Sequence, residues 1–200
     1  GEGIDTAVWN GAAGDYVLSI SSLTVTEKGE GGASDTVENV ELLEFADGYS
    51  FGAEGALDFR LMEGAQSLSA EDLTSVVELY AAYFDRSPDV LGLLYWGTRL
   101  AEGMTVSEIA ASFFVQEETL AAFPDPEDNA ALVDTAYENL LERSADEEGR
   151  AYWINALEQG DVSRPEFMLA IINGAKADTG SAEDVRTITD KSDIGIAYAA

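Results

Sequence analysis

Residues 80–103 read YAAYFDRSPDVLGLLYWGTRLAEG, and residues 137–160 read YENLLERSADEEGRAYWINALEQG. When residue 80 is aligned with residue 137, nine of the 24 positions are identical and no gap is needed. The identical pairs are Tyr80/Tyr137, Arg86/Arg143, Ser87/Ser144, Asp89/Asp146, Gly92/Gly149, Tyr95/Tyr152, Trp96/Trp153, Leu100/Leu157 and Gly103/Gly160. This pattern predicts a tandem repeat whose units are too small to bury their apolar side chains alone.

Each copy contains the start of a helix. We expect Ser87 to cap the first of these helices, with Pro88 at its first helical position, where no N–H is needed. Ser144 would cap the second, and Glu147 would complete a capping box with it. Three further boxes are predicted, by Ser69 with Asp72, Thr105 with Glu108, and Ser163 with Glu166.

Charged residues of opposite sign flank these predicted caps. Asp89 and Asp146 would lie in the first helical turn, where the helix dipole favours a negative charge. Arg86 and Arg143 could reach them as bidentate ion pairs. An Arg–Asp pair that recurs in both copies is more typical of a structural turn than of a site that binds an anion or a cation. Asp89 and Asp146 are nevertheless the candidate ligands if calcium binds, since the Asp-x-Ser-x-Asp spacing at 85–89 resembles the start of a calcium loop.

Aromatic and glycine residues complete the motif. Gly103 and Gly160 stand where a helix commonly ends in the left-handed conformation. Tyr95-Trp96 and Tyr152-Trp153 supply large side chains at helical spacing, which favours a core position. The alternative interpretation is a stacking platform for carbohydrate.

The periodicity of the chain divides it in two. We expect a β-rich segment over residues 1–62, with strand patterns at 16–20, 23–26 and 37–45. Asp47-Gly48 is typical of a hairpin turn. A helical domain is expected over residues 63–200, with repeat one at about 72–123 and repeat two at about 129–178. The predicted class is therefore α+β, a short antiparallel β segment followed by an all-helical two-repeat domain.

Composition excludes several functions. The chain has 200 residues, a net charge of -29, no His and no Cys. This acidity repels nucleic-acid backbones and anionic membrane surfaces. His- or Cys-dependent catalytic sites cannot be built. No apolar run is long enough to cross a bilayer, so membrane insertion is not expected. The remaining metal ligands are oxygen atoms, which suit hard cations such as calcium.

The motif of both copies, Arg-Ser-x-Asp-x-x-Gly-x-x-Tyr-Trp at 86–96 and 143–153, resembles the repeat of domain-of-unknown-function family 4214. The second copy departs from the first by Ala145 in place of Pro88. The resemblance covers residues 72–178 and implies an all-helical domain distantly similar to phycobilisome linker domains. Such domains occur in large secreted bacterial proteins, including S-layer and haemolysin-type calcium-binding proteins. The resemblance implies no activity.

The N-terminal segment is similar to another kind of sequence. Residues 3–8 and 40–48 resemble the region that follows calcium-binding repeats of the RTX type, although the glycine-rich nonapeptide array itself is absent from the sequence. This resemblance implies type I secretion and an extracellular or cell-surface location.

Three functions remain open at this stage. The leading expectation is a non-catalytic scaffold, adhesion or interaction module of a larger RTX-like protein, with a protein or glycan partner at a cell surface. One alternative is a calcium-responsive module. The other is a glycoside hydrolase, which would need two carboxylates in a cleft, one with a raised pKa.

Overall fold

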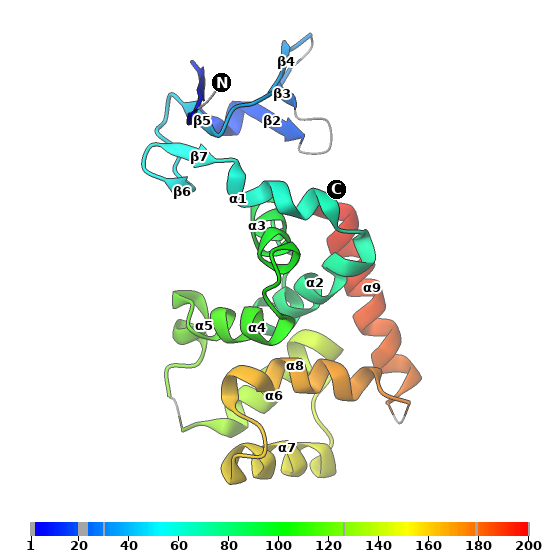
Figure 1. Ribbon diagram of the computed structural model, residues 1–200. Helices are drawn as coiled ribbons and strands as arrows, with labels where there is room; N and C mark the ends of the chain where they lie inside the picture. Colours follow the sequence, from blue (N-terminus) through cyan, green and yellow to red (C-terminus); the bar gives the residue numbers. More distant parts are fainter. Residues whose placement is uncertain (1–2, 20–23, 30, 126, 179, 200) are drawn as a thin grey trace.

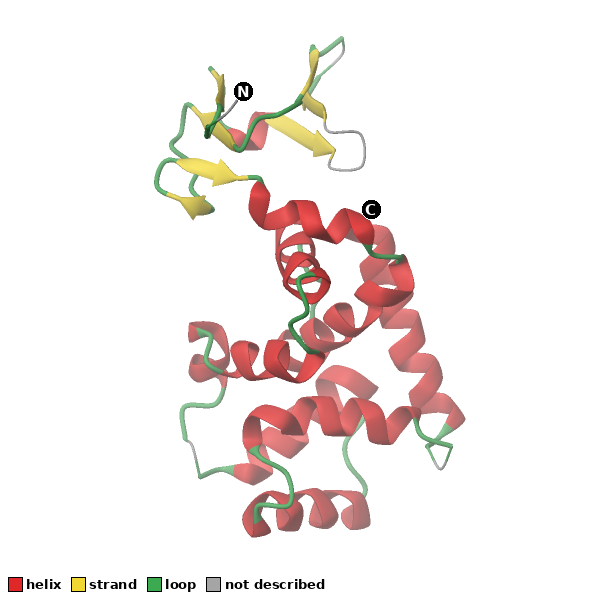
Figure 2. Ribbon diagram, viewed as in Figure 1, coloured by secondary structure: helices red, strands yellow, loops and turns green. Residues whose placement is uncertain are grey.

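A β-rich region precedes a larger helical region in the structure. The computed structural model describes residues 3–19, 24–29, 31–125, 127–178 and 180–199. Figure 1 shows the strands gathered at one end of the molecule, with the helices stacked beneath them. Figure 2 shows the same division by secondary structure. The predicted α+β class is confirmed, although Ile20 and Leu23 of the predicted strands lie outside the described residues.

The described strands form two small sheets. One sheet has the order β1-β5-β7-β6 and the other has the order β2-β3-β4. The strands are β1 (Thr6–Trp9), β2 (Tyr16–Ser19), β3 (Thr24–Glu27), β4 (Ser34–Thr36), β5 (Leu42–Phe45), β6 (Gly52–Ala53) and β7 (Ala56–Asp58). Their pairs are antiparallel except β1–β5, which is parallel. The sequence analysis did not predict this pair, because alternation within a strand carries no information on its partner's direction.

The hairpin prediction at Asp47-Gly48 is wrong. The chain does turn there, with Gly48 at φ 67°, but the strands on either side do not pair. The two-residue hairpin instead joins β6 to β7 through Glu54 and Gly55, where Gly55 has φ 74°. Glycine takes this left-handed conformation without the steric cost that other residues bear.

Aromatic residues hold the β region together. Trp9 stacks on Phe45 at 5.8 Å between ring centroids, and Tyr16 lies 5.7 Å from Phe45. The core of this region also receives Leu91 and Leu94 from the helical region. The β region is thus packed on a helix.

The helical region follows the predicted capping signals at three of its helix starts. Its longer helices are α2 (Ala70–Phe84), α3 (Val90–Ala101), α4 (Val106–Phe114), α6 (Asn129–Leu141), α7 (Glu147–Gln159), α8 (Arg164–Lys176) and α9 (Ala182–Ala199), and its short elements are α1 (Arg60–Glu63), η2 (Gly64–Ser67) and α5 (Glu117–Ala122). Capping boxes start α2, α4 and α8 as predicted. None of the helices in the described residues is both long and apolar enough to span a membrane.

Equivalent parts of the two predicted repeats face one another. The Asn139 side-chain amide of α6 donates to the carbonyl of Ala82 on α2, and these two positions are 57 residues apart. The Tyr83 hydroxyl oxygen lies 3.1 Å from the carbonyl oxygen of Ala110 on α4 and 3.1 Å from that of Pro165 on α8. Its hydrogen can be donated to either carbonyl. Helices α4 and α8 occupy corresponding places in the two predicted repeats, so the interface is close to self-complementary.

Helix α9 closes this interface from one side. Its residue Ile188 is buried in the helical core. The Lys191 ammonium lies 3.2 Å from a carboxylate oxygen of Asp85 and 3.1 Å from one of Glu142. These two acids end α2 and α6 and stand at equivalent positions of the aligned stretches. One lysine therefore joins the same position of both aligned stretches.

The two lysines that link distant helices should differ in their effect on stability. Lys176 pairs with Glu78, whose side chain is 6% exposed, whereas the acids paired with Lys191 are 61% and 67% exposed. Lys176→Met leaves a buried carboxylate without its cation and should cost about 2 kcal/mol or more. Lys191→Met should cost about 1 kcal/mol or less, since exposed pairs are screened by water. Urea unfolding measures both, and equal losses would contradict the assignment.

Candidate functional site

The repeated spacing of the motif builds two similar corners. We call residues 85–89 the first corner, which joins α2 to α3, and residues 142–146 the second corner, which joins α6 to α7. Each begins with a non-glycine residue in the left-handed conformation, Asp85 at φ 48° and Glu142 at φ 53°. These residues end the preceding helices and turn the chain sharply.

The N-caps of α3 and α7 are aspartates and not serines. An Asp89 carboxylate oxygen accepts from the Gly92 N–H at 2.7 Å, and Asp146 accepts from Gly149 at 2.8 Å. The prediction that Ser87 and Ser144 cap these helices is wrong, as is the placement of the aspartates in the first turn. In the first corner Pro88 restrains Ser87 to extended backbone, which delays the start of the helix. In both corners the carboxylate is a strong acceptor that the helix dipole also favours.

A tyrosine hydroxyl fills the space that each motif glycine leaves open. A Cβ on Gly92 would lie 2.5 Å from the Tyr80 hydroxyl oxygen, and one on Gly149 would lie 2.9 Å from that of Tyr137. Burial, with a smaller contribution from Asp89, raises the pKa of Tyr80 to about 12. Burial also raises the pKa of Tyr137. Both hydroxyls therefore stay protonated at neutral pH.

The motif arginines stack on these tyrosines. The guanidinium carbon of Arg86 lies 5.3 Å from the Tyr80 ring centroid, and that of Arg143 lies 5.2 Å from Tyr137. The predicted ion pairs to Asp89 and Asp146 are not formed, because those carboxylates face the helix N-termini. Arg86 instead pairs with Glu118 of α5 at 3.0 Å, and Arg143 donates two bonds to Asp184 of α9.

The remaining motif residues have mainly packing roles. Trp96 contacts Phe113 at 5.0 Å and Trp153 contacts Phe167 at 5.4 Å, and both tryptophans are half-buried. Tyr95 packs edge-on against Phe51 of the β region, whereas Tyr152 is 64% exposed. Gly103 and Gly160 have φ 99° and 76° after α3 and α7, as predicted for helix ends.

The first corner opens on a groove. Two adjoining hollows, of about 470 and 510 Å³, share Tyr80, Trp96 and Gln116 as lining residues. We call them together the aromatic groove; its other lining residues are Phe51, Gly52, Leu61, Phe84, Arg86, Asp89, Gly92, Tyr95, Phe113, Glu117 and Glu118. Six of the nine repeated residues of the first copy thus line one surface, namely Tyr80, Arg86, Asp89, Gly92, Tyr95 and Trp96. Gln116 and Glu118 were missed from the sequence because they lie at the start of α5, outside the matched 24 positions.

In the second corner α9 supplies a buried partner to the arginine. Asp184, whose side chain is 8% exposed, accepts both bonds from Arg143, whereas the Glu118 partner of Arg86 is 53% exposed. The two corners share their internal contacts and differ in what lies against the arginine.

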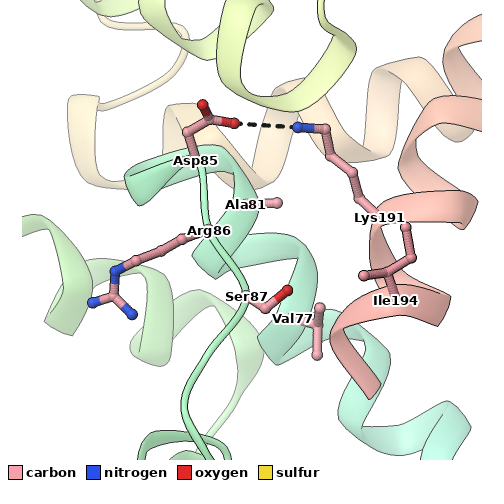
Figure 3. Close-up of a pocket in the computed structure, with 7 residues that line it drawn as sticks. All are labelled: Val77, Ala81, Asp85, Arg86, Ser87, Lys191 and Ile194. Atoms are coloured by element: carbon pink, nitrogen blue, oxygen red, sulfur yellow. Dashed lines mark hydrogen bonds and ion pairs between the residues drawn. The ribbon is translucent and has the colours of Figure 1, made fainter. Parts of the chain in front are cut away.

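A smaller hollow of about 250 Å³ lies on the other side of the first corner (Figure 3). It is lined by Val77 of α2, Ser87 of the corner, and Lys191 and Ile194 of α9. Arg86 also lines this hollow, but in Figure 3 its guanidinium group points away from Ser87, Val77 and Ile194, and Arg86 lines the aromatic groove as well. Helix α9 approaches α2 closely here, since a Cβ on Gly195 would lie 2.3 Å from a Val77 methyl carbon. This hollow belongs to the seam between α2 and α9.

The carboxylates are engaged in structural roles. Within the described residues, no group of three or more acidic side chains is arranged to hold a metal ion. The candidate ligands Asp89 and Asp146 cap helices and lie in separate corners. The buried acids of the same residues are Asp58, Glu78 and Asp184, each paired with a cation. The pKa of Asp58 is lowered, chiefly by its hydrogen bonds from Arg60, which is the opposite of what a general acid requires.

The part of the chain that contains the second corner is similar to a known protein family. Residues 124–179 match the family described as Domain of unknown function (DUF4214). The match contains α6, α7 and α8 with the whole second corner. No curated protein and no solved structure matches the chain at a significant level.

The tyrosine contact makes a prediction for the motif glycines. Gly92→Ala forces a methyl group against the Tyr80 hydroxyl and should cost about 1–3 kcal/mol of unfolding free energy. Gly149→Ala should cost less, because its Cβ would lie 2.9 Å from the tyrosine hydroxyl and not 2.5 Å. Gly14→Ala is the control, since a Cβ there meets nothing within 4 Å. Urea unfolding of the three variants tests this, and a neutral Gly92→Ala would contradict it.

The aspartate caps make a prediction for acid stability. The backbone N–H of Gly149 holds the pKa of Asp146 below its usual range. A folded pKa below the unfolded value stabilises the protein above about pH 4, and this stabilisation is lost as the pH falls further. Asp146→Asn keeps the accepting oxygen without titrating, so its stability relative to wild type should improve between about pH 5 and pH 2. Urea unfolding across this range measures the difference; parallel pH profiles would contradict it.

Proposed function

We propose that this chain is a non-catalytic interaction module of a larger secreted bacterial protein of the RTX type. Its binding surface is the aromatic groove of the first corner, and its partner lies at a cell surface. The observation that supports it is the aromatic groove beside Arg86, whose partner Glu118 is 53% exposed, whereas Arg143 pairs with the buried Asp184.

The recurrence of the corner supports a tandem repeat. The aspartate cap, the tyrosine hydroxyl against glycine and the arginine over tyrosine all recur at equivalent positions of the two aligned stretches. We infer that residues 72–123 are a unit of the same kind as the matched segment. The repeat supplies the scaffold, and the first unit supplies the open surface.

Five of the described carboxylates are unsuited to act as the general acid of a hydrolase. Asp58, Asp72, Glu108, Asp134 and Asp146 have lowered pKa values, in each case chiefly through hydrogen bonds that the carboxylate accepts. Groups of this kind stay ionised at neutral pH and make poor general acids.

Cell binding tests the proposal. The fluorescently labelled chain should bind saturably to intact bacterial or animal cells, measured by flow cytometry. Trp96→Phe keeps an aromatic ring against Phe113 and removes part of the groove wall, so it should weaken binding at least about fivefold. Trp153→Phe makes the matched change in the second copy and should bind as wild type.

Two results would contradict the proposal. Absence of saturable binding would remove the interaction role, and equal loss in both tryptophan variants would remove the groove from it.

Thermal unfolding in chelator, magnesium and calcium should give the same midpoint at matched ionic strength. A rise in calcium alone would favour the calcium-responsive module instead, because a ligand of the native state raises its melting temperature.

A further inference from the structure

We infer that the partner of the aromatic groove is a protein segment that carries arginine side chains, and that one of its guanidinium groups binds beside Asp89. This inference rests on the proposed function and adds the chemistry of the partner. Its basis is the way in which the chain binds its own arginines, together with the charge of the groove.

Three of the chain's arginines share one environment, in which the guanidinium lies over a tyrosine ring and pairs with a carboxylate. The guanidinium carbon is 5.2 to 5.3 Å from the ring centroid, and the ion pairs are 2.7 to 3.3 Å long. A planar guanidinium suits both contacts, whereas the ammonium of lysine is a more strongly hydrated point charge. The three sets are Arg86 with Tyr80 and Glu118, Arg99 with Tyr95 and Glu102, and Arg143 with Tyr137 and Asp184.

One part of the aromatic groove offers the same two groups without an arginine. We call the hollow of about 510 Å³ the Asp89 hollow, since Asp89 supplies its carboxylate. Its partly exposed aromatic walls are Phe51, Tyr95 and Trp96. Among the described residues that line it, none is basic. Asp89 accepts from the Gly92 N–H through Oδ1, which leaves Oδ2 open to a further donor.

The aromatic groove as a whole is negative. Its charged lining residues are Asp89, Glu117, Glu118 and Arg86. Glu118 pairs with Arg86, and the Glu117 carboxylate has no hydrogen-bond or ion-pair partner among the described residues. The helix starts beside Asp89 and Glu117 offset about half a charge each, so about one negative charge remains. The net charge of -29 adds attraction for a cation at longer range.

These charges disfavour the other classes of partner. An anionic ligand would meet the carboxylates that Arg86 does not neutralise. A neutral sugar gains no attraction from the negative charge of the groove. A zwitterionic lipid headgroup carries a phosphate close to its ammonium, and the carboxylates would repel that phosphate. A peptide segment presents guanidinium groups without such an anion, and two adjoining hollows suit successive side chains.

The test uses the full chain and four probes. They are a hexapeptide of alternating glycine and arginine, its lysine counterpart, its counterpart with uncharged citrulline, and cellohexaose as a neutral sugar. NMR follows the indole N–H signals of the three tryptophans. At physiological ionic strength the arginine peptide should shift the Trp96 signal and leave Trp153 unchanged. The citrulline peptide should bind at least about tenfold more weakly, because it lacks the charge.

Three results with these probes would overturn the inference. Absence of a Trp96 shift with the arginine peptide would remove the site. Equal binding of the citrulline peptide or of cellohexaose would remove the requirement for a cation. Equal or tighter binding of the lysine peptide would remove the preference for a guanidinium.

Matched variants separate the site from general attraction by an acidic chain. Asp89→Asn and Asp146→Asn each remove one negative charge and keep an oxygen that accepts from the helix start. Calorimetry should show that Asp89→Asn weakens binding of the arginine peptide about tenfold, whereas Asp146→Asn changes it less than about twofold. If Asp89→Asn does not fold, Glu117→Gln and Glu148→Gln, in the first turns of α5 and α7, replace the pair. Equal losses within the pair used would overturn the inference.

Cell binding separates this inference from the proposed function. Binding that protease treatment of the cells abolishes, and for which the arginine peptide competes, would support the protein partner. Binding that survives protease would overturn it and leave the interaction module standing; its loss after periodate oxidation would then assign the partner as a glycan. Absence of cell binding would overturn the proposed function itself, while the peptide titrations still decide the chemistry of the groove.

Discussion

The contact between a tyrosine hydroxyl and a glycine at the start of the next helix sets the geometry of the helical region. The hydroxyl of Tyr80 occupies the place of a side chain on Gly92, and Tyr137 does the same at Gly149. Only a residue without a Cβ lets the helix begin so close to the preceding one. The aspartate cap accepts from the N–H of the same glycine, and the arginine stacks on the ring of the same tyrosine. Both contacts therefore lie where the two helices approach each other.

The two corners show how one local structure serves different ends. In the second corner α9 supplies a buried carboxylate to the arginine, and the corner becomes part of the core seam. In the first corner the arginine turns to α5, whose short helix leaves an aromatic surface open. Lys191 ties the corresponding ends of α2 and α6 together. Stability and a candidate binding surface thus come from copies of one motif.

The chain has a net charge of -29, and the carboxylates whose burial is most unfavourable are paired with cations. Buried carboxylates meet Arg60, Lys176 and Arg143, and others accept hydrogen bonds at helix starts, where the dipole favours them. Three of the ten basic residues are thus placed where burial would make an unpaired acid strongly destabilising. Acidity on this scale is compatible with a folded chain because most of it stays in water.

Local sequence patterns were enough to predict the α+β class, the capping boxes of α2, α4 and α8 and the helix ends at Gly103 and Gly160, because these depend on residues within a few positions of one another. They identified the motif residues but assigned the caps to Ser87 and Ser144 and paired the arginines with nearby aspartates. Only the tertiary structure decided that Arg86 meets Glu118, that Arg143 meets Asp184 and that β1 pairs in parallel with β5. Those partners lie 32 to 41 residues away along the chain, and local spacing carries no information on which distant side chain the folded chain brings near.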